Sequence, residues 1–161
     1  MPRAGTALRR TGRRTGRPNK IAQCSPRLPY GTSGGDNGAA VTATHGVLLE
    51  VAYDGTEFHG WAAQRNARTV QETLQGAVLA IDPRAGTLRG ASRTDAGVHA
   101  SGQLAAYDTE LDIPARGWTL GLNQHLPEDL AVRSARPVPS GFSPRLSARG
   151  KRYRYRVLVD A

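Results

Sequence analysis

The chain contains 161 residues, the length of one folded domain of ordinary size. Its 22 Lys and Arg residues outnumber 13 acidic residues, which gives a formal net charge of +9. A single cysteine, Cys24, excludes an intrachain disulfide and a zinc site built from several thiolates. No run of residues approaches the roughly 20 apolar residues that a membrane-spanning helix needs. We therefore expect a soluble, basic, intracellular protein without a membrane association.

The first 44 residues are predicted to form a disordered basic tail, followed by one folded domain over residues 45–161. The tail carries eight basic side chains and one acidic side chain, Asp36, and its only aromatic residue is Tyr30. Such a composition cannot bury enough surface to offset the entropy of the chain. The tail could contact phosphates or could be inert. In either case its removal is expected to leave folding nearly unchanged.

The folded domain is predicted to open with a strand and a helix. Residues 47–53 are rich in strand formers and end at a turn signal, Asp54-Gly55. Thr69 and Glu72 have the spacing of a capping box, and apolar residues then follow at helical spacing over residues 70–81. The Asp-Pro pair at residues 82–83 predicts the end of this helix.

The second part of the domain adds strands around a further helix. Strands are predicted over residues 87–91 and 102–107, on either side of a polar loop. A helix is predicted to begin at Pro114, and strands are predicted over residues 130–138 and 152–159. The order β-α-β-β-α-β-β predicts an α+β fold, in which an antiparallel or mixed β-sheet carries its helices on one face.

The polar loop between the two central strands, Ser92 to His99, is the densest cluster of candidate catalytic residues. Asp95 beside Arg93 would stay ionised and could act as a nucleophile or a base, although a turn aspartate often only binds its own backbone. The four histidines (His45, His59, His99 and His125) lack the spacing of metal ligands. We expect neither a metal site nor a nucleotide cofactor site.

The last predicted strand lies in a run of six basic residues without an acid, from Arg145 to Arg156. Strand alternation puts Tyr153 and Tyr155 on one face and Arg152, Arg154 and Arg156 on the other. The tyrosines could stack on nucleic-acid bases while the cations contact phosphates. Alternatively, the tyrosines could simply face the core.

Five of these segments together resemble the TruA-type tRNA pseudouridine synthases. They are Tyr53-Asp54-Gly55 with Phe58-His59-Gly60-Trp61, residues 69–74, Arg93-Thr94-Asp95 within residues 92–100 followed by Gly102-Gln103, residues 123–132, and Lys151-Arg152-Tyr153-Arg154-Tyr155. They occur in the order of the family over residues 46–160. The resemblance implies a ferredoxin-like, RRM-like half of a pseudouridine synthase.

The resemblance also implies an activity and roles for individual residues. The enzyme would isomerise uridine to pseudouridine in the anticodon stem-loop of tRNA, at nucleotides 38–40, in the cytoplasm and without a cofactor. Asp95 would attack the extruded uridine or assist cleavage of its glycosidic bond, and Arg93 would pair with Asp95. Tyr153 would stack on the uracil and help to remove the C5 proton. Four basic residues are expected to contact RNA: Arg149, Lys151, Arg152 and Arg154.

Two departures from the family affect these expectations. Ser92 stands where the family usually has glycine, a change that could alter the backbone angles of the loop. The chain also ends at Ala161, where family members continue with a second half that completes the pocket, adds an arginine and contributes to a homodimer. We therefore expect an N-terminal half that is inactive and poorly behaved alone. The alternative to the enzyme is a catalytically silent RNA-binding fragment.

Overall fold

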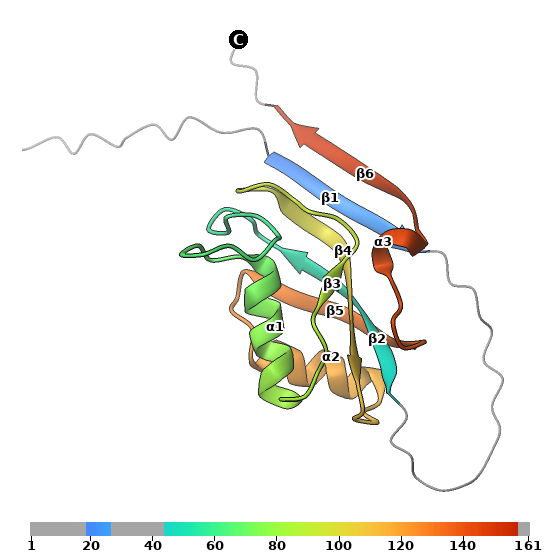
Figure 1. The fold of residues 1–161 in the computed structure, drawn as a ribbon. Helices are drawn as coiled ribbons and strands as arrows, with labels where there is room; N and C mark the ends of the chain where they lie inside the picture. Colours follow the sequence, from blue (N-terminus) through green and yellow to red (C-terminus); the bar gives the residue numbers. More distant parts are fainter. Residues whose placement is uncertain (1–18, 27–43, 158–161) are drawn as a thin grey trace, which may run out of the picture.

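The computed structural model describes residues 19–26 and 44–157, which form a six-stranded sheet with three helices (Figure 1). The strand order is β5-β2-β4-β1-β6, and the short strand β3 also pairs with β4. The strands are β1 (Asn19–Pro26), β2 (His45–Tyr53), β3 (Arg89–Gly90), β4 (His99–Thr109), β5 (Leu130–Val138) and β6 (Ala148–Arg156). The helices are α1 (Val70–Ile81), α2 (Ala115–Gln124) and α3 (Pro144–Ser147).

Helices α1 and α2 lie together on one face of the sheet, as the sequence predicts (Figure 1). The Thr69 side chain accepts a hydrogen bond from the Glu72 N–H and so caps α1. The main core joins inward-facing side chains of these helices to alternate residues of β2. They are Val70, Leu74, Ala77, Val78, Trp118 and Leu122 from the helices, and Val47, Leu49, Val51 and Tyr53 from β2. The period of two in β2 and of about 3.6 in α1 is what brings these residues to one layer.

The opposite face of the sheet carries a smaller apolar cluster. Leu48, Leu104 and Ala106 pack there with Ala91 and Val138, and Phe142 lies against them. The single turn of α3 follows Phe142 and leads directly into β6. Neither α3 nor this second cluster was predicted from the sequence.

Strand β1 corrects the prediction that all of residues 1–44 are disordered. Residues 19–26 pair in parallel with β4 and antiparallel with β6, so β1 lies inside the sheet (Figure 1). Ala22 is the one buried side chain among those described in β1. The strand is therefore held mainly by backbone hydrogen bonds to its two neighbouring strands. The rest of the predicted tail, residues 1–18 and 27–43, lies outside the described residues.

The remaining elements occur where the sequence predicts them, some with the predicted ends and some with shifted ends. The helix over residues 70–81 and the strand over residues 130–138 are confirmed at both ends. The strand predicted over residues 102–107 extends to 99–109, because its first residues pair with β1. By contrast, the strand predicted over residues 87–91 is reduced to Arg89–Gly90. Strand β6 begins four residues earlier than predicted, and the end of that prediction falls outside the described residues.

None of the helices in the described part of the chain is long and apolar enough to cross a membrane.

Deleting residues 1–26 should expose β6, contrary to the expectation that the first 44 residues are dispensable for folding. Among the described strands, β6 pairs with β1 alone. Without β1, the amide groups of β6 lose their partners, and their hydrogen exchange should approach the rate of an unstructured chain. Amides of β5, which pairs with β2, serve as the control and should keep their protection. Unchanged exchange in β6 would show that β1 does not hold it.

Candidate active site

The loop that carries Arg93, Thr94 and Asp95 joins β3 to β4 and is held by the segment that follows β2. The Trp61 N–H donates to the Thr94 carbonyl at 3.0 Å, and the Gly97 N–H donates to the Phe58 carbonyl at 3.1 Å. A further bond, from the Val98 N–H to the Asp95 carbonyl at 3.2 Å, closes the turn. Backbone hydrogen bonds on both sides of Asp95 therefore fix the position of this loop while its side chain stays exposed.

Two glycines allow this close approach of the two segments. Gly60 has a φ of +96°, and a Cβ there would lie 2.7 Å from the Thr94 carbonyl oxygen. A Cβ at Gly55 would lie 2.0 Å from the Val98 carbonyl oxygen. Both distances are shorter than van der Waals contact, so a side chain at either position would push the two segments apart.

A buried hydrogen bond anchors the same loop to the sheet. The Tyr53 hydroxyl lies 2.8 Å from the Thr94 hydroxyl, next to Asp95 in the chain. Burial raises the pKa of Tyr53 to about 12, so its phenol stays protonated over the physiological range. The sequence analysis missed this pair, because 41 residues separate its members.

Ser92 fits the loop without strain. Among the described residues, Asn66 is the only non-glycine residue with a positive φ, so Ser92 does not occupy a conformation that requires glycine. The buried Gln103 side chain donates to the Ser92 carbonyl at 2.6 Å and lies 3.4 Å from its hydroxyl. The concern that serine disturbs the backbone at this position is therefore not confirmed.

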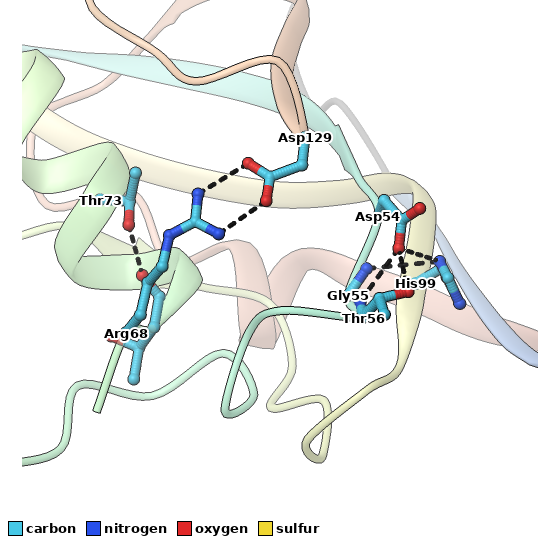
Figure 2. A network of polar contacts seen from close by, with 8 residues as sticks. Asp54, Gly55, Thr56, Arg68, Thr73, His99 and Asp129 are labelled. Atoms are coloured by element: carbon cyan, nitrogen blue, oxygen red, sulfur yellow. Dashed lines mark hydrogen bonds and ion pairs between the residues drawn. The ribbon is translucent and has the colours of Figure 1, made fainter. Parts of the chain in front are cut away.

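A polar network lies beside the loop, where β2 ends and where β4 and β5 begin (Figure 2). The Asp54 carboxylate accepts hydrogen bonds from the Thr56 hydroxyl and N–H, which hold the pKa of Asp54 below its usual range. One Asp54 oxygen also lies 3.1 Å from Nδ1 of His99. His99 thus ties the start of β4 to the turn after β2, in agreement with a structural role.

A second part of the network joins the segment before α1 to the turn before β5 (Figure 2). Arg68 donates to both carboxylate oxygens of Asp129 at 2.6 and 2.7 Å, and this pairing lowers the pKa of Asp129. The Arg68 guanidinium also lies over the Phe58 ring, 4.1 Å from its centroid. The Val70 and Gln71 N–H groups donate to the Gly60 and Trp61 carbonyls, so four of the five sequence motifs meet at one end of the sheet.

Tyr153, from the fifth motif, lies on the same face of the sheet as Tyr53. Cα pairing runs from Tyr53 in β2 to Ala100 in β4, then to Ala22 in β1 and to Tyr153 in β6. The two residues between the tyrosines in this row are alanines, Ala100 and Ala22. Tyr153 and Tyr155 are 40% and 59% exposed, so neither is buried among the residues that the structure describes.

Lys20 of β1 lies against this pair of tyrosines. Its Nζ is 4.6 Å from the ring centroid of Tyr153 and 5.7 Å from that of Tyr155. Both distances are within the range of a cation–π contact. Nothing in the sequence pointed to this lysine, because its position depends on the pairing of β1 with β6.

The charged candidates are arranged differently from the prediction. Among the described residues, Arg93 forms no ion pair with Asp95, and both side chains are exposed, where such a pair would gain little over hydration. Lys151 lines a cleft together with Arg93, whereas Arg152 and Arg154 line a separate small cavity with Ile21 and Ser101. Arg149, Lys151 and Arg152 line a third hollow beside Gln23. No cluster of metal-ligating side chains occurs in the described part of the chain.

The architecture defines an α+β protein in which a loop held by backbone hydrogen bonds presents an exposed carboxylate, and in which the edge strand β6 carries exposed tyrosines. Residues 50–145 match the family model of tRNA pseudouridine synthases. The chain is 48% identical over 114 residues to tRNA pseudouridine synthase A of Citrifermentans bemidjiense, a match that covers 71% of this chain and 46% of that protein. It is 47% identical over 111 residues to the protein of that name from Geobacter sulfurreducens, covering 69% and 46%. The chain therefore belongs to the tRNA pseudouridine synthase family, and it spans about half the length of these relatives.

Replacing Tyr53 by Phe should destabilise the protein by about 1–3 kcal/mol, because the buried Thr94 hydroxyl loses its partner. Tyr107→Phe is the matched control. The Tyr107 hydroxyl is also buried but has no hydrogen-bond partner among the described residues, so its removal should be neutral or stabilising. Chemical unfolding of the two variants measures the difference. Equal effects would mean that the bond to Thr94 contributes nothing.

Proposed function

We propose that this chain carries the uridine-isomerising site of a tRNA pseudouridine synthase, which acts on the anticodon stem-loop at nucleotides 38–40. The observation that carries the proposal is the loop at residues 92–98 of a chain that belongs to this family: backbone hydrogen bonds and the Tyr53–Thr94 bond hold the loop, and its Asp95 is exposed. The tRNA substrate supports a cytoplasmic location. We also propose that the full-length protein forms a homodimer.

Asp95 would carry out the central step. Its carboxylate makes no hydrogen bond or ion pair to a described residue, so it is free to approach C1′ of an extruded uridine or to assist departure of the base. The N1–C1′ bond breaks, the detached uracil turns, and a C5–C1′ bond forms; C5 loses its proton and N1 gains one. Reactant and product are isomers, so this balance requires no oxidant or reductant.

Tyr153 and Arg93 would support this step from either side. The exposed ring of Tyr153 offers a surface on which a uracil can stack, and its hydroxyl can take part in removal of the C5 proton. Arg93 lies two residues before Asp95 and is exposed, so it can contact the RNA around the extruded nucleotide.

A second candidate function is RNA binding without turnover. The observation that favours it is the extent of the match, which covers 46% of the relatives from Citrifermentans bemidjiense and Geobacter sulfurreducens. A binding module would use the same basic and aromatic surface but would not depend on the Asp95 carboxylate. The two functions therefore differ in their response to loss of that one charge.

Asp95→Asn should lower pseudouridine formation by about 10²- to 10⁴-fold, because the amide keeps the size of the side chain but removes the reactive carboxylate. Pseudouridine is measured in unmodified tRNA under two conditions. In the first, the 161-residue chain is present alone; in the second, the part of a relative that the match does not cover is added as a separate protein fragment. RNA affinity should be unchanged. If parent and variant bind RNA equally and neither forms pseudouridine in either assay, RNA binding without turnover is the correct function.

Tyr153→Ala should reduce RNA affinity and turnover together, because it removes a stacking surface with a contribution of about 1–3 kcal/mol per base. Tyr153→Phe keeps the ring and should lose turnover but not affinity. Tyr155→Ala removes the neighbouring, more exposed ring and serves as the control. A Tyr153→Ala variant with the affinity and turnover of Tyr155→Ala would exclude a special role for Tyr153.

A further inference from the structure

A cleft of about 440 Å³ opens next to the loop that carries Asp95. Its walls come from segments far apart in the sequence: β3, the Ser92–Arg93 part of the loop, α3 and β6. Four of its lining residues are basic, namely Arg89, Arg93, Arg145 and Lys151, and none of its lining residues is acidic. The fold therefore gathers positive charge from four elements around one hollow.

Most of this charge has no compensating partner. Arg89 donates to both carboxylate oxygens of Asp108 at 2.8 and 3.0 Å, so its charge is largely neutralised. By contrast, Arg93, Arg145 and Lys151 form no ion pair with a residue that the structure describes. Cations that converge without a counter-charge create a positive potential, which favours binding of an anion.

The cleft also offers a neutral donor. The Trp61 indole forms part of its wall, and a Cβ at Gly90 would lie 2.4 Å from the indole nitrogen, so glycine is required beside it. Trp61 is 2% exposed, and within the described part of the chain its indole N–H makes no hydrogen bond, so the cleft is the side from which an acceptor could reach it.

We propose that this cleft binds backbone phosphates of the RNA strand next to the extruded uridine. The proposal rests on the proposed function and adds where the RNA strand on either side of the uridine would lie. Ser92 and Arg93 line the cleft and lead directly to Thr94 and Asp95, so a nucleotide whose sugar reaches Asp95 has its neighbours beside the cleft. Phosphate contacts of this kind fix the register of a strand without reading its bases.

The geometry divides the basic run of β6 into two groups. Lys151 lines the cleft, whereas Arg152 and Arg154 line the separate cavity beside Ile21, and Lys151 and Arg152 also share the hollow beside Gln23. Sequence composition treats these residues as one cationic patch. The proposal instead assigns phosphate binding to Lys151, Arg145 and Arg93. Arg152 and Arg154 would not contact the RNA strand that binds in the cleft.

The test compares two double variants with the same loss of charge. Arg145→Gln with Lys151→Gln removes two cations from the cleft, and Arg152→Gln with Arg154→Gln removes two from the other cavity. All four side chains are exposed, so both variants should keep the unfolding temperature of the parent. Binding of an anticodon stem-loop RNA to the 161-residue chain is measured over a range of salt concentrations.

The cleft variant should bind about tenfold more weakly and should reduce the slope of log K against log salt by about 1.4, or roughly 0.7 for each lost contact to single-stranded RNA. The control variant should change both quantities by much less. Replacing the target uridine by cytidine should leave the difference between the variants intact, because phosphates carry no sequence information.

Equal losses in the two variants, or a larger loss in the control, would overturn the assignment of the cleft while leaving the proposed function intact. Failure of the parent chain to bind the RNA would overturn the proposed RNA partner and the cleft assignment with it. These outcomes rest on RNA binding alone, so they do not depend on whether the chain turns over its substrate.

Discussion

The close contact between two backbone segments, residues 54–61 and residues 92–98, is the constraint on which the rest of the site depends. The Thr94 carbonyl accepts from Trp61, and the Phe58 carbonyl accepts from Gly97, so Asp95 lies between two fixed points. This contact requires glycine at residues 55 and 60, since a Cβ at either would meet a carbonyl oxygen. A carboxylate must be held to within a fraction of an ångström of its productive position, and here backbone hydrogen bonds supply that restraint without burying the charge.

Elements with local signals were predictable from the sequence. Helix α1 has its cap at Thr69, its apolar period and its stop signal within 14 residues of one another, and its predicted ends are correct. Strand β5 alternates buried and exposed residues at its start and was also predicted at both ends. Strand β1 has no such signal. It is a polar segment that becomes a strand because β4 and β6 offer it hydrogen-bonding partners on both sides, which is a tertiary effect that propensity does not report.

The site was predictable as a set of residues but not as an arrangement. The loop with Arg93 and Asp95 was recognised because its polar residues lie between two apolar strands. The Tyr53–Thr94 bond was not, since it joins residues 41 positions apart. The expected pairing of Arg93 with Asp95 was wrong because adjacency in the sequence does not direct two exposed side chains toward each other. Lys20 reaches Tyr153 only through the pairing of β1, so no local pattern could have indicated it.

The distribution of paired and unpaired charges has a consequence for catalysis. Asp54, Asp108 and Asp129 each accept hydrogen bonds that lower their pKa, so these carboxylates stay ionised as structural links. Asp95 has no such link, and under the proposed function it would work close to a polyanionic RNA that repels it. Two unit charges 4 Å apart in water interact by about 1 kcal/mol, and uncompensated cations in the neighbouring cleft act against that repulsion. Under the proposed function, positive charge beside the loop would allow RNA to approach Asp95, whereas a salt bridge to Asp95 itself would occupy the oxygen that has to react.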